Sequence, residues 1–269
     1  MAWSRTYDEA EPQRVNRWLA QSGVCSRREA EALIAAGQVF IDGQKVEDPG
    51  RKIEQGQTLT LNDQAQARLE GQLTVILNKP VGYVSAQPEA GQIPAARLLG
   101  ARTLFGESDD IPGPERRLAP IGRLDQDSRG LLLLSEDGVL TKAVIGPEAD
   151  MEKEYLVRVR GDVGEPVLAR LRHGLELDGR KLKPAKVTLA GDQRLRFILR
   201  EGRNRQIRRM CDLVGLSVID LYRLRIGPLK LGDLPEGRWR PITAAERAAL
   251  LRGDAPRAPT RRPPRPRRP

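Results

Sequence analysis

The chain has 269 residues, of which 39% are hydrophobic and 30% charged, as in globular proteins of one or two domains. No stretch approaches the roughly 18 consecutive apolar residues of a membrane span. The polar N-terminus also lacks the apolar core of a signal peptide, so we expect a cytoplasmic protein with no membrane contact. One histidine, His173, and two distant cysteines exclude a His-based triad, a zinc cluster and a disulfide framework, and no metal site is predicted.

The charge is unevenly distributed along the chain. Lys and Arg number 46 against 36 Asp and Glu, a net charge of +10 that suits a polyanionic partner. Residues 252–269 hold seven of the arginines and only one aspartate, and they are rich in proline. This composition cannot bury a core, so we predict a disordered tail that attracts phosphate without sequence preference. Residues 1–12 are also predicted to be disordered.

Residues 13–62 form the first predicted domain, which begins with two helices. Apolar residues at spacings of three and four predict a short helix that ends at Gly23. Ser26 and Glu29 have the spacing of a capping box for a second helix, which Gly37 ends.

A small sheet follows these helices. Strands are predicted at residues 38–41 and 44–46, joined by a tight turn at Asp42 and Gly43. A third strand is predicted at residues 58–61. Residues 63–71 are polar and show no periodicity, so we expect a linker there.

Basic side chains on and around the two helices make a candidate phosphate-binding surface. Serine and arginine at a helix N-terminus, where backbone N–H groups are free, favour contact with an anion. The same arginines could instead be solvated surface residues, and charge alone does not separate the two interpretations. The residues predicted to contact RNA here are Arg14, Arg17, Ser26, Arg27 and Arg28.

The second predicted domain covers residues 72–251. Short strands near turns alternate with helices, which favours an α+β fold with a mixed, mainly antiparallel sheet flanked by helices. Residues 86–117 contain Gly, Pro and acids and are expected to form a long surface connection. The strands are predicted at 73–77, 131–134, 154–159, 187–189 and 195–199, and the helices at 204–213 and 243–251.

Asp125 is the candidate catalytic carboxylate. It lies between an apolar segment and the strongly apolar strand 131–134, and Gly130 allows a tight turn between them. A carboxylate fixed between rigid elements is suited to catalysis. The pattern alone is more often that of a turn carboxylate that caps nearby N–H groups.

Two further segments carry candidate site residues. Tyr155 enters an alternating strand and could present its hydroxyl to a cleft, although most strand tyrosines have no such role. Farther along, Arg203, Arg205, Arg208 and Arg209 crowd together within seven residues. Such crowding destabilises the fold unless an anion compensates, and buried apolar neighbours would fix which arginines face inward.

The first domain resembles the S4 RNA-binding domain. The residues that carry the resemblance run from RVNRWLAQSGVCSRREA through ALIAAGQVFIDG, and the match covers nearly all of residues 14–61. The resemblance implies binding to structured RNA. It does not imply catalysis, because S4 domains also occur in ribosomal proteins.

The second domain resembles the pseudouridine synthases that act on single sites in ribosomal RNA. GRLDQDSRGLLLLSEDG matches the family's catalytic signature, and NKPVGYVS, EKEYLV, EGRNRQIRRMC and LPEGRWRPIT match further family segments. The resemblance is closest to the F type among the enzymes for the large ribosomal RNA. The B type and the type for the small ribosomal RNA are near neighbours. The connection at residues 92–118 is longer than expected, which leaves the target site open.

The resemblance implies isomerisation of a uridine, favouring 23S over 16S ribosomal RNA. Substrate and product are isomers, so no cofactor is expected, and we expect a monomer. It implies that Asp125 is the catalytic carboxylate, that Arg208 pairs with it, and that Tyr155 stacks on the uracil. Arg123 is expected to fill the space of the flipped nucleotide, and Arg203, Arg205 and Arg209 to contact RNA. Attack at C6 of the base and chemistry at C1′ of the ribose both stay open.

Two alternatives compete with this interpretation. A non-catalytic RNA-binding or ribosome-assembly factor would need only the first domain and the tail, and would have no use for Asp125, Tyr155 and Arg208. A methyltransferase would need a cofactor pocket, but the sequence has no Gly-rich turn after a strand of the dinucleotide-binding type.

Overall fold

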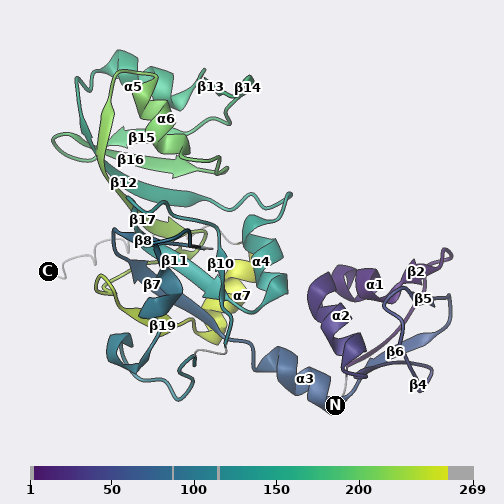
Figure 1. The fold of residues 1–269 in the computed structure, drawn as a ribbon. Coiled ribbons are helices and arrows are strands. Elements are labelled where there is room, and N and C mark those ends of the chain that lie inside the picture. The colour runs from purple at the N-terminus through teal and green to yellow at the C-terminus, as the bar shows by residue number, and fades with distance from the viewer. Residues whose placement is uncertain (1–2, 87, 114–115, 254–269) are drawn as a thin grey trace, which may run out of the picture.

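The computed structural model describes residues 3–86, 88–113 and 116–253. An N-terminal unit of two helices and short strands is joined through a third helix to a larger unit built on one long sheet (Figure 1). The predicted α+β class is confirmed. The predicted disordered tail falls outside the described residues from residue 254 onward. Among the described residues, every helix is too short or too polar to cross a bilayer.

The N-terminal unit has the predicted helix, helix, sheet order. The Ser26–Glu29 capping box is present in both directions, and Asp42 and Gly43 have the positive φ values, 49° and 79°, of a tight hairpin turn. The sheet order is β1-β6-β3-β4, with β2 and β5 paired separately. The elements are β1 (Ser4–Thr6), β2 (Gln13–Arg14), α1 (Val15–Gln21), α2 (Arg27–Ala35), β3 (Val39–Ile41), β4 (Gln44–Lys45), β5 (Lys52–Ile53) and β6 (Thr58–Leu61).

The prediction of disorder for residues 1–12 is wrong for the residues that the structure describes. Strand β1 pairs with β6, and Tyr7 is fully buried with its ring 5.5 Å from that of Trp18. The Tyr7 hydroxyl donates to the carbonyl of Glu11. Two aromatic residues in a polar stretch give no periodicity, so only their tertiary contacts show that the segment is ordered.

The segment predicted as a linker, residues 63–71, forms helix α3 (Asp63–Glu70) between the two units. The Asn62 side chain caps this helix by accepting a hydrogen bond from the Ala65 N–H at 2.9 Å. Ala65 is its one fully buried residue, so the helix lacks the apolar stripe that makes a helix visible in a sequence.

The larger unit is built on a sheet in the order β15-β16-β12-β17-β11-β7-β19, with β10 beside β11 and β18 beside β17. All pairs are antiparallel except β11 with β17. The strands of this sheet are β7 (Thr74–Lys79), β10 (Ala119–Ile121), β11 (Arg129–Ser135), β12 (Lys153–Arg160), β15 (Lys186–Leu189), β16 (Arg194–Leu199), β17 (Ser217–Ile226), β18 (Leu229–Lys230) and β19 (Trp239–Pro241).

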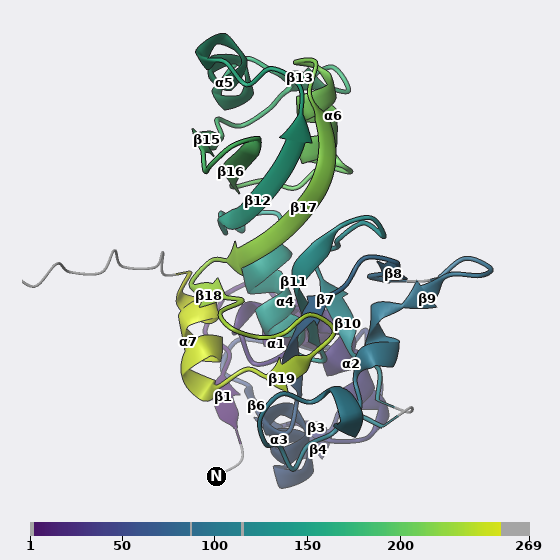
Figure 2. The same ribbon diagram turned by 90° about the vertical axis from the view of Figure 1, so that its left-hand side faces the viewer.

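Helices cover this sheet at both ends, and Figure 2 shows the long strands β12 and β17 running between the two halves. Short pairs β8–β9 and β13–β14 lie off the sheet. The remaining elements are β8 (Tyr83–Val84), β9 (Ile93–Pro94), the 3-10 helices η1 (Ala95–Leu98) and η2 (Ala101–Thr103), α4 (Gly138–Ile145), α5 (Glu165–Arg172), β13 (Glu176–Leu177), β14 (Arg180–Lys181), α6 (Gln206–Asp212) and α7 (Ala244–Arg252).

The four consecutive leucines of β11 explain how the sheet is held between two cores. Leu132 and Leu134 pack in the cluster that includes α5 and α6 residues, whereas Leu131 and Leu133 pack in the cluster that includes α4 and α7 residues. Successive side chains of a strand point to opposite faces. A continuous apolar run therefore means that both faces of β11 are covered, and the loop before it is anchored to a rigid strand.

The two units meet at the capping box of α2. Glu29 Oε1 accepts a hydrogen bond from the N–H of Gly138, the first residue of α4, at 3.2 Å, and another from the Gln72 side chain. A Cβ atom at position 138 would overlap the side chains of Ser26 and Glu29. The helix that carries Arg27 and Arg28 is thus fixed against the helix that leads to the pocket described below.

Replacing Gly138 with leucine is expected to separate the two units. Leucine favours a helix more than glycine does, by up to about 1 kcal/mol, so α4 itself should not unfold. The new side chain needs the space of Ser26, so we expect faster proteolysis between residues 62 and 73 and a larger radius of gyration in solution scattering. Lys142→Leu, at an exposed position of the same helix, is the control. Equal behaviour of the two variants would contradict the contact.

Candidate active site

Asp125 lies on a short loop between β10 and β11. Gly122 and Gly130 have positive φ values of 74° and 105° on either side of it. At Gly130 the chain approaches β17 so closely that a Cβ atom would overlap the Arg223 backbone. The predicted tight turn at Gly130 is therefore present, and glycine is required there both for its conformation and for the close approach.

The segment around β8 holds this loop from one side. The Ser85 hydroxyl donates to the carbonyl of Leu124 at 2.7 Å and accepts from its N–H at 2.9 Å. The N–H of Gly82 donates to the carbonyl of Gln126 at 2.8 Å. Both backbone neighbours of Asp125 are thus fixed, which leaves its carboxylate as the free group of the loop.

Arg223 of β17 holds the loop from the other side, and the sequence analysis missed it. Its Nε donates to the carbonyl of Leu131 at 2.7 Å and its Nη1 to the carbonyl of Arg123 at 3.2 Å. The side chain is almost fully buried, with 3% of the residue exposed. Segment 221–226 alternates apolar residues with arginines, and this pattern could have identified Arg223. A charged side chain that faces the core of a sheet must be paired or hydrogen-bonded, so it often holds a specific contact.

Lys79, at the end of β7, is a second buried cation that the sequence analysis missed. Its Nζ donates to the carbonyls of Pro80 and Tyr83 at 2.9 and 2.8 Å. Burial lowers the pKa of Lys79 to about 8, although the nearby Asp127 and Asp125 carboxylates raise it. Its contacts fix the turn that positions Gly82 and Ser85.

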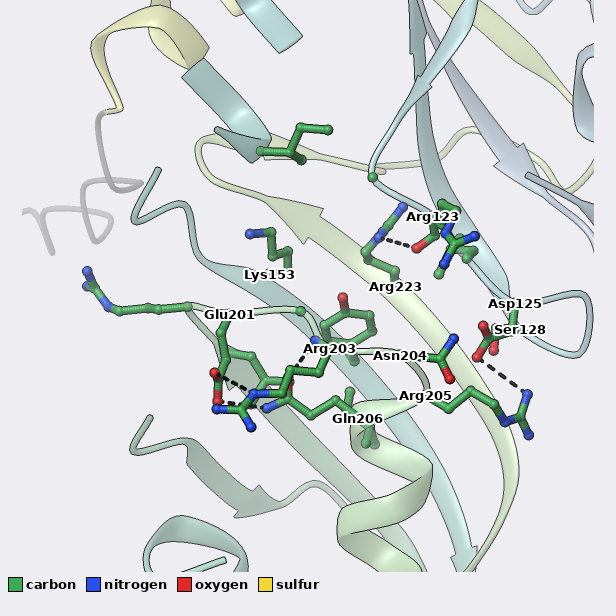
Figure 3. Close-up of a pocket in the computed structure, with 18 of the residues that line it drawn as sticks. Arg123, Asp125, Ser128, Lys153, Glu201, Arg203, Asn204, Arg205, Gln206 and Arg223 are labelled. Carbon is green, nitrogen blue, oxygen red and sulfur yellow. Dashed lines mark hydrogen bonds and ion pairs between the residues drawn. The ribbon is translucent and has the colours of Figure 1, made fainter. Parts of the chain in front are cut away.

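The three predicted catalytic residues line one open trough of about 610 Å³. Asp125 comes from the loop before β11, Tyr155 from β12 and Arg208 from α6. The Asp125 side chain is 32% exposed and that of Arg208 11%, while Tyr155 is half-buried. Figure 3 shows Asp125 and Ser128 at one end of the trough and Lys153 toward the other. The structure therefore brings together residues from distant parts of the chain, as a binding site requires.

The predicted ion pair between Arg208 and Asp125, both of which the structure describes, is absent, and a different pairing takes its place. Arg208 Nη2 lies 3.2 Å from Asp127 Oδ1 and donates to the Asp127 carbonyl and the Ser128 hydroxyl. Arg205 Nη1 is the guanidinium nitrogen near Asp125, 3.5 Å from Oδ2. Asp127 also accepts from both Nη atoms of Arg205, so its carboxylate lies between the two arginines.

Asp127 is a third residue that the sequence analysis missed. Burial raises its pKa, but the hydrogen bond from Arg205 and the positive charges of Arg208 and Arg205 outweigh this, so the pKa lies below its ordinary value. Asp127 stays ionised and organises both arginines beside Asp125. The signal available in the sequence was a second aspartate two positions after Asp125 in the loop before β11.

Arg205 adopts a left-handed conformation, with φ 47° and ψ 33°, at the start of α6. A non-glycine residue there costs about 1–2 kcal/mol. The conformation turns the guanidinium toward Asp125 and Asp127, and such local strain is concentrated at functional sites.

Two other residues of this unit that were predicted to bind RNA, Arg203 and Arg209, have hydrogen-bond or ion-pair partners within the protein. Arg203 donates to the carbonyls of Leu177, Arg180 and Lys181, and so holds the β13–β14 hairpin. Arg209 forms a two-pronged ion pair with Asp178, at 2.6 and 3.0 Å. Both arginines thus have partners within the protein, and their contact with RNA stays a prediction.

Arg123, unlike these two arginines, is not held by other side chains or carbonyls of the described residues. Its side chain is exposed at the rim of the trough and makes no hydrogen bond or ion pair with any described residue. It stands two positions before Asp125, so it is free to enter a bound nucleic acid.

In the N-terminal unit, Arg14, Arg17 and Arg27 line one hollow of about 650 Å³ together with Lys52. None of these four cations forms an ion pair with a described residue. Arg28 instead faces a second hollow, lined also by Arg68 and Arg116, near the contact between the two units. The Ser26 side chain is occupied by the cap of α2.

An N-terminal unit with unpaired arginines, joined to a unit with a carboxylate, a tyrosine and arginines in one trough, is an arrangement suited to an enzyme that acts on a polyanion such as RNA. Sequence profiles agree. The profile described as RNA pseudouridylate synthase matches residues 73–213, and that of the S4 domain matches residues 13–59.

Individual relatives extend this result over most of the chain. An uncharacterized RNA pseudouridine synthase of Aquifex aeolicus is 33% identical, covering 89% of this chain and 94% of that protein. The dual-specificity RNA pseudouridine synthase RluF of Escherichia coli K12 is 35% identical, covering 89% of this chain and 78% of that protein. The ribosomal large subunit pseudouridine synthase B of Bacillus subtilis is 33% identical, covering 87% and 93%.

A solved structure described as a pseudouridylate synthase has a TM-score of 0.61 and 28% identity, covering 88% of this chain and 99% of that one. The chain belongs to the RNA pseudouridylate synthase family and carries an N-terminal S4 domain.

Proposed function

We propose that this enzyme converts one specific uridine of ribosomal RNA, in the 23S molecule, to pseudouridine, with Asp125 as its catalytic carboxylate. One observation carries the proposal: Asp125, Tyr155 and Arg208 line the same trough although they come from a loop, a strand and a helix far apart in sequence. The names of the relatives, which include a ribosomal large subunit enzyme, support the choice of RNA.

Each residue has a role that fits its surroundings. Asp125 is partly exposed, with Arg205 Nη1 3.5 Å from its Oδ2, so its carboxylate is within reach of a substrate and can act as a nucleophile. Tyr155 offers a ring for stacking on uracil and a hydroxyl that can accept or relay the C5 proton. Arg208 fixes Asp127 and Ser128, and so shapes the loop rather than pairing with Asp125.

The reaction breaks the N1–C1′ bond of uridine and forms a C5–C1′ bond in its place. Substrate and product are isomers, so no oxidant, reductant or group donor enters the balance. A carboxylate nucleophile divides one difficult substitution into two easier steps. These are tasks that side chains already lining the trough can perform.

Binding of the RNA is assigned to two separate surfaces. The cations Arg14, Arg17, Arg27 and Lys52, which have no ion-pair partner among the described residues, hold phosphates at the S4 domain. The target nucleotide must leave its stack to reach Asp125, and the exposed side chain of Arg123 fills the vacated space.

Mapping pseudouridine in ribosomal RNA from cells with and without the gene tests this proposal. We expect a single position in 23S RNA to lose the modification and to regain it when the purified enzyme is added to the extracted RNA. Loss at a 16S position would correct the substrate but keep the chemistry. An unchanged map in both RNAs, with no product from the purified enzyme, would refute the proposal.

A further inference from the structure

The trough extends well beyond Asp125, and Lys153 marks its far part. In Figure 3 Lys153 and Asp125 stand apart along the trough, with Arg223 between them. Lys153 is two residues before Tyr155 on β12, so both side chains emerge on the same face, about 7 Å apart along the strand. A ring stacked on Tyr155 would therefore have Asp125 near one edge and Lys153 near the opposite edge.

Lys153 differs from its basic neighbours in the trough, because Lys183 and Arg200 both pair with Asp150. Lys153 is half-buried, yet it makes no hydrogen bond or ion pair with any residue that the structure describes. Arg123 is also without such a partner, but it is exposed to solvent at the rim. A partly buried ammonium without an acceptor is costly, which points to an acceptor that arrives with the substrate.

Arg223 supplies a second unused donor at the same place. It lies directly opposite Tyr155 in the β12–β17 pairing, next to a β-bulge, and lines the trough. Two of its nitrogens hold the Asp125 loop, whereas Nη2 is buried and has no partner among the described residues. Buried N–H groups are almost always paired, so this nitrogen also calls for a ligand oxygen.

The charges around Lys153 agree with this geometry. Burial and the positive charge of Arg223 lower the pKa of Lys153, Asp150 raises it, and Lys183 lowers it further. Lys153 and Arg223 thus face the same part of the trough, and no carboxylate of the described residues pairs with Lys153 there. This arrangement is unfavourable for folding alone.

We propose that Lys153, with the free N–H of Arg223, binds the carbonyl oxygens of the target uracil and stabilises the negative charge that forms on the ring during the reaction. The inference rests on the proposed function and assigns a new residue to it. The Asp125 carboxylate bonds to C1′ as the N1–C1′ bond breaks, and the electron pair of that bond stays on the uracil, shared with O2 and O4. C5 then bonds to C1′ and displaces the carboxylate, which takes the negative charge back; the C5 proton is lost and N1 gains a proton.

The test replaces Lys153 with methionine, which keeps the length of the side chain and removes its charge. With saturating transcript of the mapped target segment, we expect the single-turnover rate to fall about 100-fold, as when one preorganised donor to a developing anion is lost. The RNA dissociation constant should change less than about 3-fold, because the charge acts in the transition state. Lys230→Met, at an exposed position of strand β18, is the matched control and should react like the wild type.

The Lys153→Arg variant tests the pH dependence of the rate, which would not change if Lys153 had only a structural role. Lysine must be protonated to act, so wild-type activity should decline as pH rises through its lowered pKa. Arginine stays charged, so the variant should recover most of the rate and keep it to higher pH.

The outcomes separate the two proposals. A wild-type enzyme that forms no pseudouridine refutes the proposed function itself. An active wild type with an unaffected Lys153→Met variant refutes only the role of Lys153. Weaker RNA binding with an unchanged rate would show that Lys153 holds a backbone phosphate instead, and would also overturn the inference.

Discussion

Replacing Asp125 with asparagine is expected to abolish pseudouridine formation, lowering the single-turnover rate at least about 10⁴-fold, the scale seen when a central catalytic group is removed. Asparagine has nearly the same shape but is neither a nucleophile nor a base. The loop should keep its structure, because Ser85 and Arg223 hold it through backbone atoms on both sides. RNA binding, measured by filter retention, should be unchanged or slightly stronger, since a negative charge is lost.

Asp127→Asn is the control because it makes the same change two residues away. Asp127 orients Arg205 and Arg208 and does not need to touch the substrate. Its variant should retain measurable activity, reduced by about 10-fold to 100-fold through misplaced arginines. An active Asp125→Asn enzyme beside an inactive Asp127→Asn enzyme would exchange the roles of the two carboxylates.

Replacing Gly130 with alanine is expected to cause the largest loss of stability. The residue has φ 105°, and a Cβ atom there would overlap the backbone N and O of Arg223. Backbone strain and overpacking together should cost about 3–5 kcal/mol, which lowers the melting temperature by about 10 °C in thermal unfolding. Activity should also fall, because the β11–β17 contact carries the hydrogen bond from Arg223 to Leu131.

The Gly232→Ala variant distinguishes the effect of backbone strain at a positive φ from the effect of steric overlap of the Cβ atom. Gly232 also has a positive φ, 64°, but no heavy atom lies within 4 Å of the Cβ position. This variant should lose only about 1–2 kcal/mol from the left-handed conformation. If the two alanine variants melt at the same temperature, close approach of β11 and β17 is not what requires glycine at position 130.

The site could be predicted from the sequence only in part. The family resemblance implies that Arg208 lies at the catalytic site, and Arg208 lines the trough between the buried Ile207 and Met210. The choice of its carboxylate partner depends on the left-handed turn at Arg205 and on how the loop meets α6. No spacing rule contains that information, so the predicted pair with Asp125 was wrong while its place in the trough was right.

The arginines at 203 and 209 illustrate the same limit. Clustered basic residues predict an anion partner, but the pattern does not say whether that partner is RNA or protein. In the structure Arg203 satisfies carbonyls of the β13–β14 hairpin and Arg209 satisfies Asp178. These protein partners lie far away in the chain, 22 positions from Arg203 and 31 from Arg209, so no local pattern predicts them.

Local patterns were sufficient to predict the α+β class, the capped second helix of the first domain, the apolar strand 131–134 and the tight turn at Gly130. These features depend on periodicity, capping and turn chemistry, which act between residues a few positions apart. The folded arrangement was needed to learn which cations reach Asp125, that Lys79 and Arg223 are buried, and that Lys153 lacks a partner among the described residues. Arg223 and the Leu131 carbonyl are 92 positions apart, and burial of a charge depends on contacts of that range.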